Sequence, residues 1–458
     1  MKMHILKKVT AEYELLPKVV LTGRETEFSL RGLGIEREFY PGEAFIIRVI
    51  PQEQIATART LKIGDEDCYE EVRVIAGTDR CVRFRLTLPR EQIYTLRLLG
   101  AAGERLGDLK VFAALEDLWR RSPMRGNTHC HVCFSDDGSE DPVVAASVYR
   151  KAGYDYLAIT DHHRVDGSVF AIEHIADLPT ELALYYGEEV HVPNAYIHAV
   201  NVGARMEGGE GLDVYYQNHR AEVERQVDAI AEEAGRTLPQ GLEPYDYAWR
   251  RWIADTIHRR GGIAIVAHPF WEYDANNTSN DMLRYLMETK LFDAVEVIHG
   301  QDNLDSMESN RQIAFWNEFR AAGGSFPVVG CDDAHRRSFD EDAQDCSRCF
   351  NHAWTVIFAQ DPSFEGFREA ILNGYCVAAE TYADAPVHVT GTYRLTNYAL
   401  FLLREYYPLH DELCFEEGRS LKDAYLGDGE ARAVLETIHG RVKRYTDRFF
   451  GRLERIER

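Results

Sequence analysis

Alternation of apolar and polar positions marks the first quarter of the chain as rich in β-strands. Residues 82–88 alternate strictly and residues 94–99 repeat the pattern, which is typical of strands with one buried face. An apolar run at 45–50 follows the turn Tyr40-Pro41-Gly42. Short strands separated by turn signals every ~8–12 residues predict a small β-sandwich-like domain over residues 1–120.

From about residue 124 the pattern changes to short apolar runs that alternate with helix-like segments. Strands are predicted at 156–160, 182–186, 263–266, 294–298 and 326–329. Helices are predicted between most of them, as at 248–260 and 310–322. Another helix is expected to begin at Asp141-Pro142, an N-cap followed by proline, and to stop at Gly153. Repeated strand–helix units favour a parallel sheet, either closed or doubly wound.

Two further segments depart from this alternation. Residues 204–245 form a longer excursion with an acidic, helix-like stretch at 221–234, which we interpret either as a solvated helix or as a lid. Residues 386–458 are predicted to form a helical C-terminal extension, because the apolar run 400–403 is followed by apolar residues near helical spacing up to Val442. This extension is interpreted as a packing or oligomerisation element, so a homo-oligomer is left open.

The bulk composition is that of a soluble globular protein. The chain has 458 residues, enough for two or three domains, with 45% hydrophobic and 28% charged residues. No run approaches the ~18 apolar residues of a membrane span. The first residues include basic side chains but lack an uninterrupted apolar core and a small-residue cleavage site, so no signal peptide is predicted. We therefore expect a cytoplasmic protein without a membrane partner.

The cysteines argue against a secreted disulfide framework. They number nine, an odd count, and are spread along the chain. The two C-x-x-C pairs, Cys130/Cys133 and Cys346/Cys349, could in principle form one zinc site. Ordinary cytosolic thiols are the preferred interpretation, because the histidines interleaved with the first pair have a different explanation.

The formal net charge of −23 bears on the choice of partner. A field of that sign repels nucleic acid, which needs a basic track for its phosphates, so long nucleic acid is not an expected partner. A small phosphorylated substrate remains compatible, because divalent ions in a pocket can reverse the local potential.

Histidines and acids follow the predicted strands at the points where the apolar runs end. The fragments are His129-Cys130-His131, Asp161-His162-His163, Gly187-Glu188-Glu189, Ala267-His268-Pro269 and Asp332-Asp333-Ala334-His335. Alternate residues of a strand point the same way, so His129 and His131 would face one cavity and could bind one cation. The carboxyl ends of barrel strands converge on one face. Five such fragments in one chain favour a metal site over unrelated histidines.

Taken together, these fragments resemble the motifs of the PHP (polymerase and histidinol phosphatase) superfamily. Gly126-Asn127-Thr128-His129-Cys130-His131 followed by Ser135-Asp136 resembles the first motif and Thr160-Asp161-His162 the second. Ala267-His268-Pro269 resembles the third and Asp333-Ala334-His335 the fourth. The resemblance covers roughly residues 124–380. The runs Gly187-Glu188-Glu189-Val190 and Val295-Glu296-Val297-Ile298 are similar to the stand-alone bacterial members.

The resemblance implies a distorted (β/α)7 barrel over residues 121–385 and two or three divalent ions, with zinc, manganese or iron as candidates. The ligands that it implies are His129, His131, Asp136, His162, Glu189, His198, His268, Asp333 and His335. Asp137 remains an alternative to Asp136, because two acids stand where the family usually has one. The D-x-H spacing selects Asp333 over Asp332. Glu189 is expected to bridge ions, since nine ligands are too many for one.

The implied activity is hydrolysis of phosphate mono- or diesters, with a metal-activated hydroxide attacking phosphorus. A small phosphorylated metabolite, a nucleotide or a short oligonucleotide would be the substrate. Candidate catalytic residues are Asp161, His163, Arg164 and His299, with Arg336 and Arg337 as further phosphate contacts and Trp271 and Tyr273 as pocket walls or stacking platforms. The alternatives are an amidohydrolase-type metal hydrolase of C–N or C–O bonds and a non-catalytic metal-binding regulatory protein.

Overall fold

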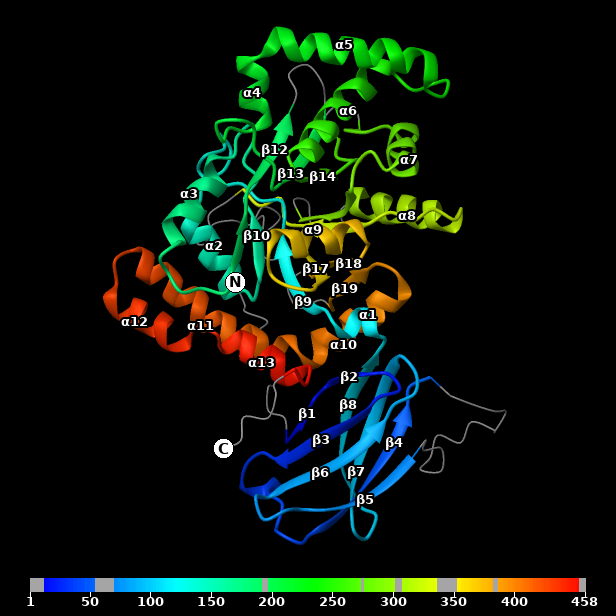
Figure 1. Cartoon of the computed structure of the whole chain (residues 1–458), viewed down its shortest axis with the longest axis vertical. Helices are drawn as coiled ribbons and strands as arrows, with labels where there is room; N and C mark the ends of the chain where they lie inside the picture. The colour runs from blue at the N-terminus through cyan, green and yellow to red at the C-terminus, as the bar shows by residue number, and fades with distance from the viewer. Residues whose placement is uncertain are drawn as a thin grey trace.

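The computed structural model describes residues 12–53, 70–191, 197–272, 276–300, 307–335, 352–381 and 386–452 (Figure 1). The order of elements is a group of β-strands, a mixed α/β region and a set of C-terminal helices. Among the helices in these ranges, none has the length and apolar character that crossing a bilayer requires.

The N-terminal strands form two sheets that enclose a core of their own. A three-stranded sheet has the order β1 (Tyr13–Leu16), β3 (Glu25–Gly32), β6 (Cys81–Thr87). A five-stranded sheet has the order β2 (Val19–Leu21), β8 (Arg105–Ala114), β7 (Gln92–Gly100), β4 (Ala44–Pro51), β5 (Glu70–Ile75). Phe28 of β3 and Ile47 of β4 are fully buried in one shared cluster, so the two sheets pack face to face.

The strand predicted from alternation at 82–88 is confirmed as β6, which buries every second residue. The strand at 94–99 is confirmed as part of β7, but the prediction of one exposed face is wrong, because nearly every residue of β7 is buried. The reason lies in the C-terminal region. Ile93 shares a core cluster with Tyr398 and Phe401, and the ring of Phe112 on neighbouring β8 lies 4.7 Å from that of Tyr398. C-terminal aromatic residues therefore cover the outer face of this sheet.

The α/β region contains two sheets. One has the order β11 (Ala183–Tyr185), β10 (Tyr156–Ala158), β9 (Ser122–Asn127), β17 (Ala353–Ala359), β18 (Cys376–Glu380), β19 (His388–Thr390). The other has the order β12 (Gly187–His191), β13 (His198–Val202), β14 (Ile263–Val266), β15 (Ala294–His299), β16 (Val328–Cys331).

The expectation of a parallel sheet holds for only part of this region. Strands β9, β10 and β11 are parallel, as are β14, β15 and β16. Strand β13 runs antiparallel to both β12 and β14, and β17 runs antiparallel to β9. The connection from β12 to β13 spans only residues 192–197. A link of that length suits an antiparallel pair, whereas a parallel pair needs a crossover of a dozen or more residues.

Isolated bridges join β12 and the segment after β16, at the two edges of the five-stranded sheet, to the segments that follow β10 and β9, beside the predicted ligands. His162 pairs with Glu189 and Cys130 pairs with Ala334, both in parallel orientation. The His131 N–H donates to the Ala334 carbonyl at 2.8 Å, and the Asp333 N–H donates to the His129 carbonyl at 2.9 Å. The strand ends that carry the histidines and acids are thus held together by the backbone.

Helices surround these sheets. They are α2 (Pro142–Lys151), α3 (Asp166–Ile175), α6 (Pro244–Arg259), α7 (Asn280–Thr289), α8 (Met307–Ala321) and α9 (Phe364–Leu372). The predicted start of α2 is confirmed, since the Asp141 carboxylate accepts from the N–H groups of Val143 and Val144. Gly153 has the positive φ of 90° expected where the chain leaves the helix.

The excursion at 204–245 carries α4 (Leu212–Asn218) and α5 (Arg220–Thr237). The structure favours a solvated helix for α5, because it buries only Val223, Val227 and Ala234 and packs on α6. In Figure 1, α4 and α5 lie at the end of the molecule opposite the N-terminal sheets.

Within the predicted helical extension at 386–458, residues 388–390 form strand β19 of the six-stranded sheet, and helices begin only at Tyr393. The helices are α10 (Tyr393–Glu405), α11 (Tyr407–Tyr425), α12 (Gly429–Ile438) and α13 (Arg441–Phe449). Helix α11 packs directly on α2, where a Cβ at Gly418 would lie 2.2 Å from the backbone nitrogen of Lys151. Beside this contact, the fully buried Arg150 guanidinium donates to Glu417 at 2.7 Å and to Asp155 at 3.1 Å. This network fastens the C-terminal helices to the α/β region.

Replacing Glu417 tests the network. Glu417→Gln removes the negative charge beside buried Arg150, so we expect the free energy of unfolding to fall by about 3 kcal/mol, measured by urea denaturation. Glu232→Gln is the matched control, because Glu232 pairs with Arg236 on the exposed face of α5. We expect the control to cost less than about 0.5 kcal/mol. Equal effects of the two substitutions would contradict a stabilising role for the buried network.

A second contact, between α1 (Glu116–Trp119) and α10, makes the stability of the fold depend on pH. The Arg394 guanidinium donates to both oxygens of Asp117 at 2.6 Å and also to Glu91 at 2.8 Å. The hydrogen bond from Arg394 lowers the pKa of Asp117 to about 2. A carboxyl group whose pKa is lowered in the folded state stabilises the fold above its ordinary pKa of about 4 and loses this contribution as the pH falls towards 2.

Asp117→Asn should therefore lower the free energy of unfolding at pH 7, and the difference from the wild type should narrow as the pH falls from about 4 towards 2. Urea titrations at several pH values measure this difference. Glu116→Gln, at the exposed neighbouring position, should parallel the wild type throughout. A constant difference for Asp117→Asn across this pH range would show that the contact acts without its charge.

Candidate metal centre

One buried carboxylate, that of Glu189 on β12, lies at the centre of a group of histidines. Its side chain is 1% exposed. Its Oε2 lies within 3.4 Å of ring nitrogens of four histidines, at 3.2 Å from His129, 3.4 Å from His131, 2.9 Å from His162 and 3.4 Å from His191. Its Oε1 lies 3.0 Å from His198 and 3.2 Å from His268. Six ring nitrogens exceed the about four lone-pair sites of a carboxylate, so hydrogen bonding alone does not account for the arrangement.

The strands explain why Glu189, and not the adjacent Glu188, faces this group. Successive residues of β12 point to opposite sides, so Glu188 projects the other way. There its carboxylate accepts from the N–H groups of Leu212 and Asp213 at 2.7 and 3.1 Å. Burial and then the nearby Asp213 carboxylate raise the pKa of Glu188 to about 8. The same alternation places His191 beside Glu189.

The first ligand group combines His129, His131, Glu189 and Asp333, all of them buried. Asp333 Oδ1 lies 3.2 Å from His129 Nε2 and 3.0 Å from His131 Nε2. Asp333 has a φ of 49°, in the left-handed region that non-glycine residues seldom adopt. Strained backbone of this kind is concentrated at functional sites.

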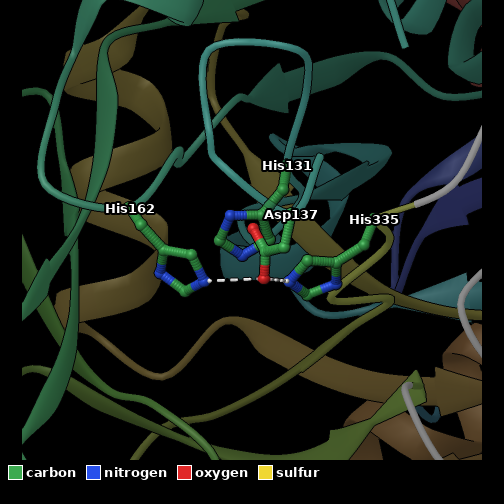
Figure 2. A group of neighbouring side chains, drawn as sticks. All are labelled: His131, Asp137, His162 and His335. Carbon is green, nitrogen blue, oxygen red and sulfur yellow. Dashed lines mark ion pairs between the residues drawn. The ribbon is translucent and has the colours of Figure 1, made fainter. Parts of the chain in front are cut away.

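The second group lies on the more open side of the centre. Figure 2 shows the Asp137 carboxylate between the rings of His162 and His335, with His131 beside them. Asp137 Oδ2 lies 3.3 Å from His162 Nε2 and 3.2 Å from His335 Nε2. Burial opposes ionisation of Asp137, but hydrogen bonds from His162 and His335 hold its pKa well below the ordinary value.

The structure brings Asp137, and not Asp136, to these histidines. The Asp136 side chain is exposed, and within the described part of the chain it has no ion pair or hydrogen bond. The cause is a tight turn, in which the Ser135 N–H donates to Val132 and the Gly138 N–H donates to Ser135. Asp137, the alternative to Asp136, is therefore the acid that lies beside His162 and His335.

The third group consists of Glu189 Oε1 with His198 Nδ1 and His268 Nε2. His198 begins β13, the next strand after Glu189, as expected. Burial lowers the pKa of His198 to about 3 and also lowers the pKa of His191. These imidazoles are therefore held in the neutral form, which is the form that binds metal ions. The Trp271 ring lies 5.5 Å from that of His198 and walls this side.

Sequence reasoning did not assign two residues of this centre. His191 follows Glu189 at the same two-residue spacing that identified His129 and His131, and this spacing was the signal that could have found it. Glu296 Oε1 lies 2.8 Å from His129 Nδ1, and Glu296 Oε2 accepts from the backbone N–H of His268 at 2.8 Å. Glu296 thus orients a histidine from behind, as carboxylate partners of metal ligands commonly do. The sequence feature that could have identified Glu296 is its charge inside the apolar run 294–298.

The candidate catalytic residues have different surroundings. Asp161 is fully buried, and its Oδ1 accepts from the N–H groups of Val132 and Ser135. Burial raises its pKa to about 6. Its contacts are those of a residue that supports the loop of Asp137. Arg164 is half-exposed and pairs with Asp166.

The other two candidates lie nearer the centre. His299 is buried, with Nε2 at 3.6 Å from Asp333 Oδ2 and its ring 5.0 Å from that of His268. His163 is half-exposed and its ring lies 6.1 Å from that of His162. Arg336, Arg337, Tyr273, Cys346 and Cys349 lie outside the described residues.

Buried polar atoms that have no hydrogen-bond partner show whether metal ions would fit this centre. His129 Nε2, His162 Nδ1, His191 Nε2, His198 Nδ1 and Glu189 Oε2 are all of this kind, and each histidine nitrogen faces Glu189. Buried polar atoms are nearly always satisfied in native proteins. Cations between these nitrogens and oxygens would satisfy them. The donor set of imidazoles and carboxylates fits zinc, manganese or iron.

Comparisons with known proteins give likenesses only among solved structures. A comparison with protein-family models finds no match, and a comparison with curated proteins finds none. A two-domain protein from Bacteroides vulgatus, with a PHP-like metal-dependent phosphoesterase predicted within it, is 16% identical, with a TM-score of 0.38. The match covers 57% of this chain and 65%, less than two thirds, of that protein. An amidohydrolase from Chromobacterium violaceum, with bound sulfate and no metal, is 19% identical over 47% of this chain and 89% of that one, with a TM-score of 0.31.

The two adjacent acids give a matched pair of variants. Asp137→Asn should weaken metal binding at the second group by about 10- to 100-fold, because it removes the carboxylate that lies between His162 and His335. Asp136→Asn should retain the metal content of the wild type. Elemental analysis after dialysis against a weak chelator measures both. Loss of metal in Asp136→Asn with retention in Asp137→Asn would overturn the assignment.

Proposed function

We propose that this chain is a metal-dependent phosphoesterase of the PHP type. The observation that carries the proposal is the convergence of six histidines on the buried Glu189 carboxylate. Glu189 belongs to two of the three ligand groups, and His131 connects the first group to the second. Shared ligands of this kind suit a centre of two or three ions spaced closely enough to act on one substrate.

The fold assigned to this centre is a distorted (β/α)7 barrel within residues 121–385, between an N-terminal domain at 1–120 and a C-terminal extension at 386–458. The seven strands would follow one another in the order β16, β9, β10, β12, β13, β14, β15. Ladders support five of the seven contacts in this ring. The bridges Cys130–Ala334 and His162–Glu189 support the other two. In such a ring the ligands lie at the face where the active sites of barrels are built.

The ligands assigned to the ions are His129, His131, Asp137, His162, Glu189, His198, His268, Asp333 and His335, with His191 and His299 adjacent to them. Divalent ions in such a centre supply a water of lowered pKa as the nucleophile and neutralise phosphoryl oxygens. The protein's own contribution is to fix the ligand geometry, through Glu296 behind His129 and Asp161 beneath the loop of Asp137.

The substrate is assigned to the open side of the centre. Asp137 is 46% exposed and His163 is 50% exposed, whereas the first ligand group is almost fully buried. A phosphate group arriving from solvent would meet this side first. The acidic chain disfavours long nucleic acid, so we assign a small phosphorylated metabolite, a nucleotide or a short oligonucleotide.

The amidohydrolase-type alternative accounts less well for the second ligand group. Such enzymes usually end their ligand set in a lone aspartate, whereas here Asp333 is followed by His335, which contacts Asp137. A third ion beside a pair suits the three non-bridging oxygens of a phosphate group better than one carbonyl oxygen.

A panel of substrates tests the proposal. Protein purified with its native metal should hold two or three ions by elemental analysis and should hydrolyse members of a phosphoester panel in preference to carboxylic esters and amides. His129→Ala and His268→Ala should each lower kcat/KM by more than about 100-fold, because each removes a buried ligand. His439→Ala, at an exposed histidine between α12 and α13, is the control and should match the wild type.

Four outcomes would contradict the proposal. One is a metal content near zero with every ligand intact. A second is full phosphatase activity in the double variant His129→Ala, His268→Ala. A preference for amides or carboxylic esters would favour the amidohydrolase alternative, and tightly bound metal without any turnover would favour a regulatory protein.

A further inference from the structure

The segment at 204–245 is fastened to the metal centre by two buried carboxylates. Glu188 of β12 is fully buried and accepts from the N–H groups of Leu212 and Asp213, at the start of α4. The approach is close, since a Cβ at Gly211 would lie 2.4 Å from Glu188 Oε1. Helix α4 is therefore held at a fixed place behind the strand that carries Glu189 and His191.

In this position the Asp213 side chain contacts two residues beside the centre. Its carboxylate is 3% exposed and Oδ2 accepts from two groups, the backbone N–H of His191 at 2.8 Å and the Nδ1–H of His163 at 2.7 Å. His191 lies in β12 and His163 follows β10, so one oxygen atom joins three separate parts of the chain. Asp213 is 50 residues from His163 in sequence.

His163 is placed as a substrate contact would be. Its φ of 64° lies in the left-handed region, which costs a non-glycine residue free energy and is concentrated at functional sites. Its side chain is half-exposed, while Nδ1 is turned to a buried carboxylate. Its ring lies 4.9 Å from that of His191 and 6.1 Å from that of His162, at the open side of the centre. Nε2 is therefore the ring atom that remains for an oxygen of a bound substrate.

We propose that Asp213 is a positioning residue that fixes the His163 ring so that Nε2 contacts an oxygen of the substrate's phosphate group. The inference rests on the proposed function and extends it, because it makes α4 part of the active site. A purely structural Asp213 would need only the His191 backbone contact. The second contact, to a side chain held in a strained backbone conformation at the site opening, orients an imidazole as carboxylate partners do in other active sites.

The experiment is a double-mutant cycle on the metal-loaded protein. Asp213→Asn and His163→Ala should each lower kcat/KM for the best phosphoester by about 10- to 100-fold, with metal content unchanged. The double variant should lose no more than His163→Ala alone, because Asp213 acts through His163. Asp228→Asn, at an exposed acid on α5 of the same segment, is the control and should match the wild type.

A spectroscopic measurement separates positioning from general stability. The Nδ1 proton that His163 shares with Asp213 should give a downfield proton resonance, identified by its loss in His163→Ala and lost also in Asp213→Asn. The inference would be overturned if Asp213→Asn lowered kcat/KM by the same factor in the wild type as in the His163→Ala variant. Loss of metal in Asp213→Asn, or a resonance that survives this substitution, would also overturn it.

Failure of the proposed function has a different signature. Wild-type protein that holds metal but hydrolyses no phosphoester would refute the function, and orthophosphate binding by calorimetry then decides the inference. Equal weakening of orthophosphate binding in Asp213→Asn and His163→Ala, with no further loss in the double variant, would support it. Absent binding in the wild type, or unchanged affinity in both variants, would overturn it.

Discussion

The burial of one carboxylate among six imidazoles is the constraint on which the rest of the site depends. Glu189 is 1% exposed, and burial opposes its ionisation, yet the surrounding histidines, His129 and His162 first, hold its pKa well below the ordinary value. Unpaired polar atoms in an apolar interior carry a large free-energy cost. Backbone bridges, the Glu296 carboxylate and the buried Asp161 keep the ligands in place against this cost. The candidate ligands are therefore held by backbone and side-chain contacts on several sides.

The sequence was sufficient to predict which candidate ligands lie together where their spacing is local. Two-residue alternation predicted that His129 and His131 face the same cavity, and both rings approach Glu189 Oε2. The two-residue alternation of a strand does not apply in the turn after His131. It therefore cannot predict which of the adjacent residues Asp136 and Asp137 faces the histidines. The turn through Ser135, whose N–H is also held by the Asp161 carboxylate, decided that choice. The same limit explains β7, whose alternation suggested an exposed face that C-terminal aromatic residues cover.

No pattern in the sequence predicted the contacts between residues that are far apart along the chain. The direction of β13 depends on the short link from β12, and Asp213 meets His163 only because Glu188 anchors α4. Asp161 stands inside a recognisable motif, yet its carboxylate supports a loop through backbone N–H groups. Motif spacing identifies which residues gather at the centre, whereas the role of each depends on which strand, turn or helix its neighbours come from.

Charge balance connects this geometry to the proposed substrate. The chain carries a formal net charge of −23, which by itself repels a phosphate group. Within the centre, the pKa values of the carboxyl groups of Asp137, Glu189, Glu296 and Asp333 all lie below their ordinary values, so these groups contribute about four negative charges at neutral pH. The same carboxylates raise the pKa of His129 and His162, and ions bound to these rings would displace their protons. Two divalent ions would cancel these charges, and a third would leave the opening positive. On this reasoning, the second ligand group, around Asp137, is the one that makes the site attractive to a phosphate dianion.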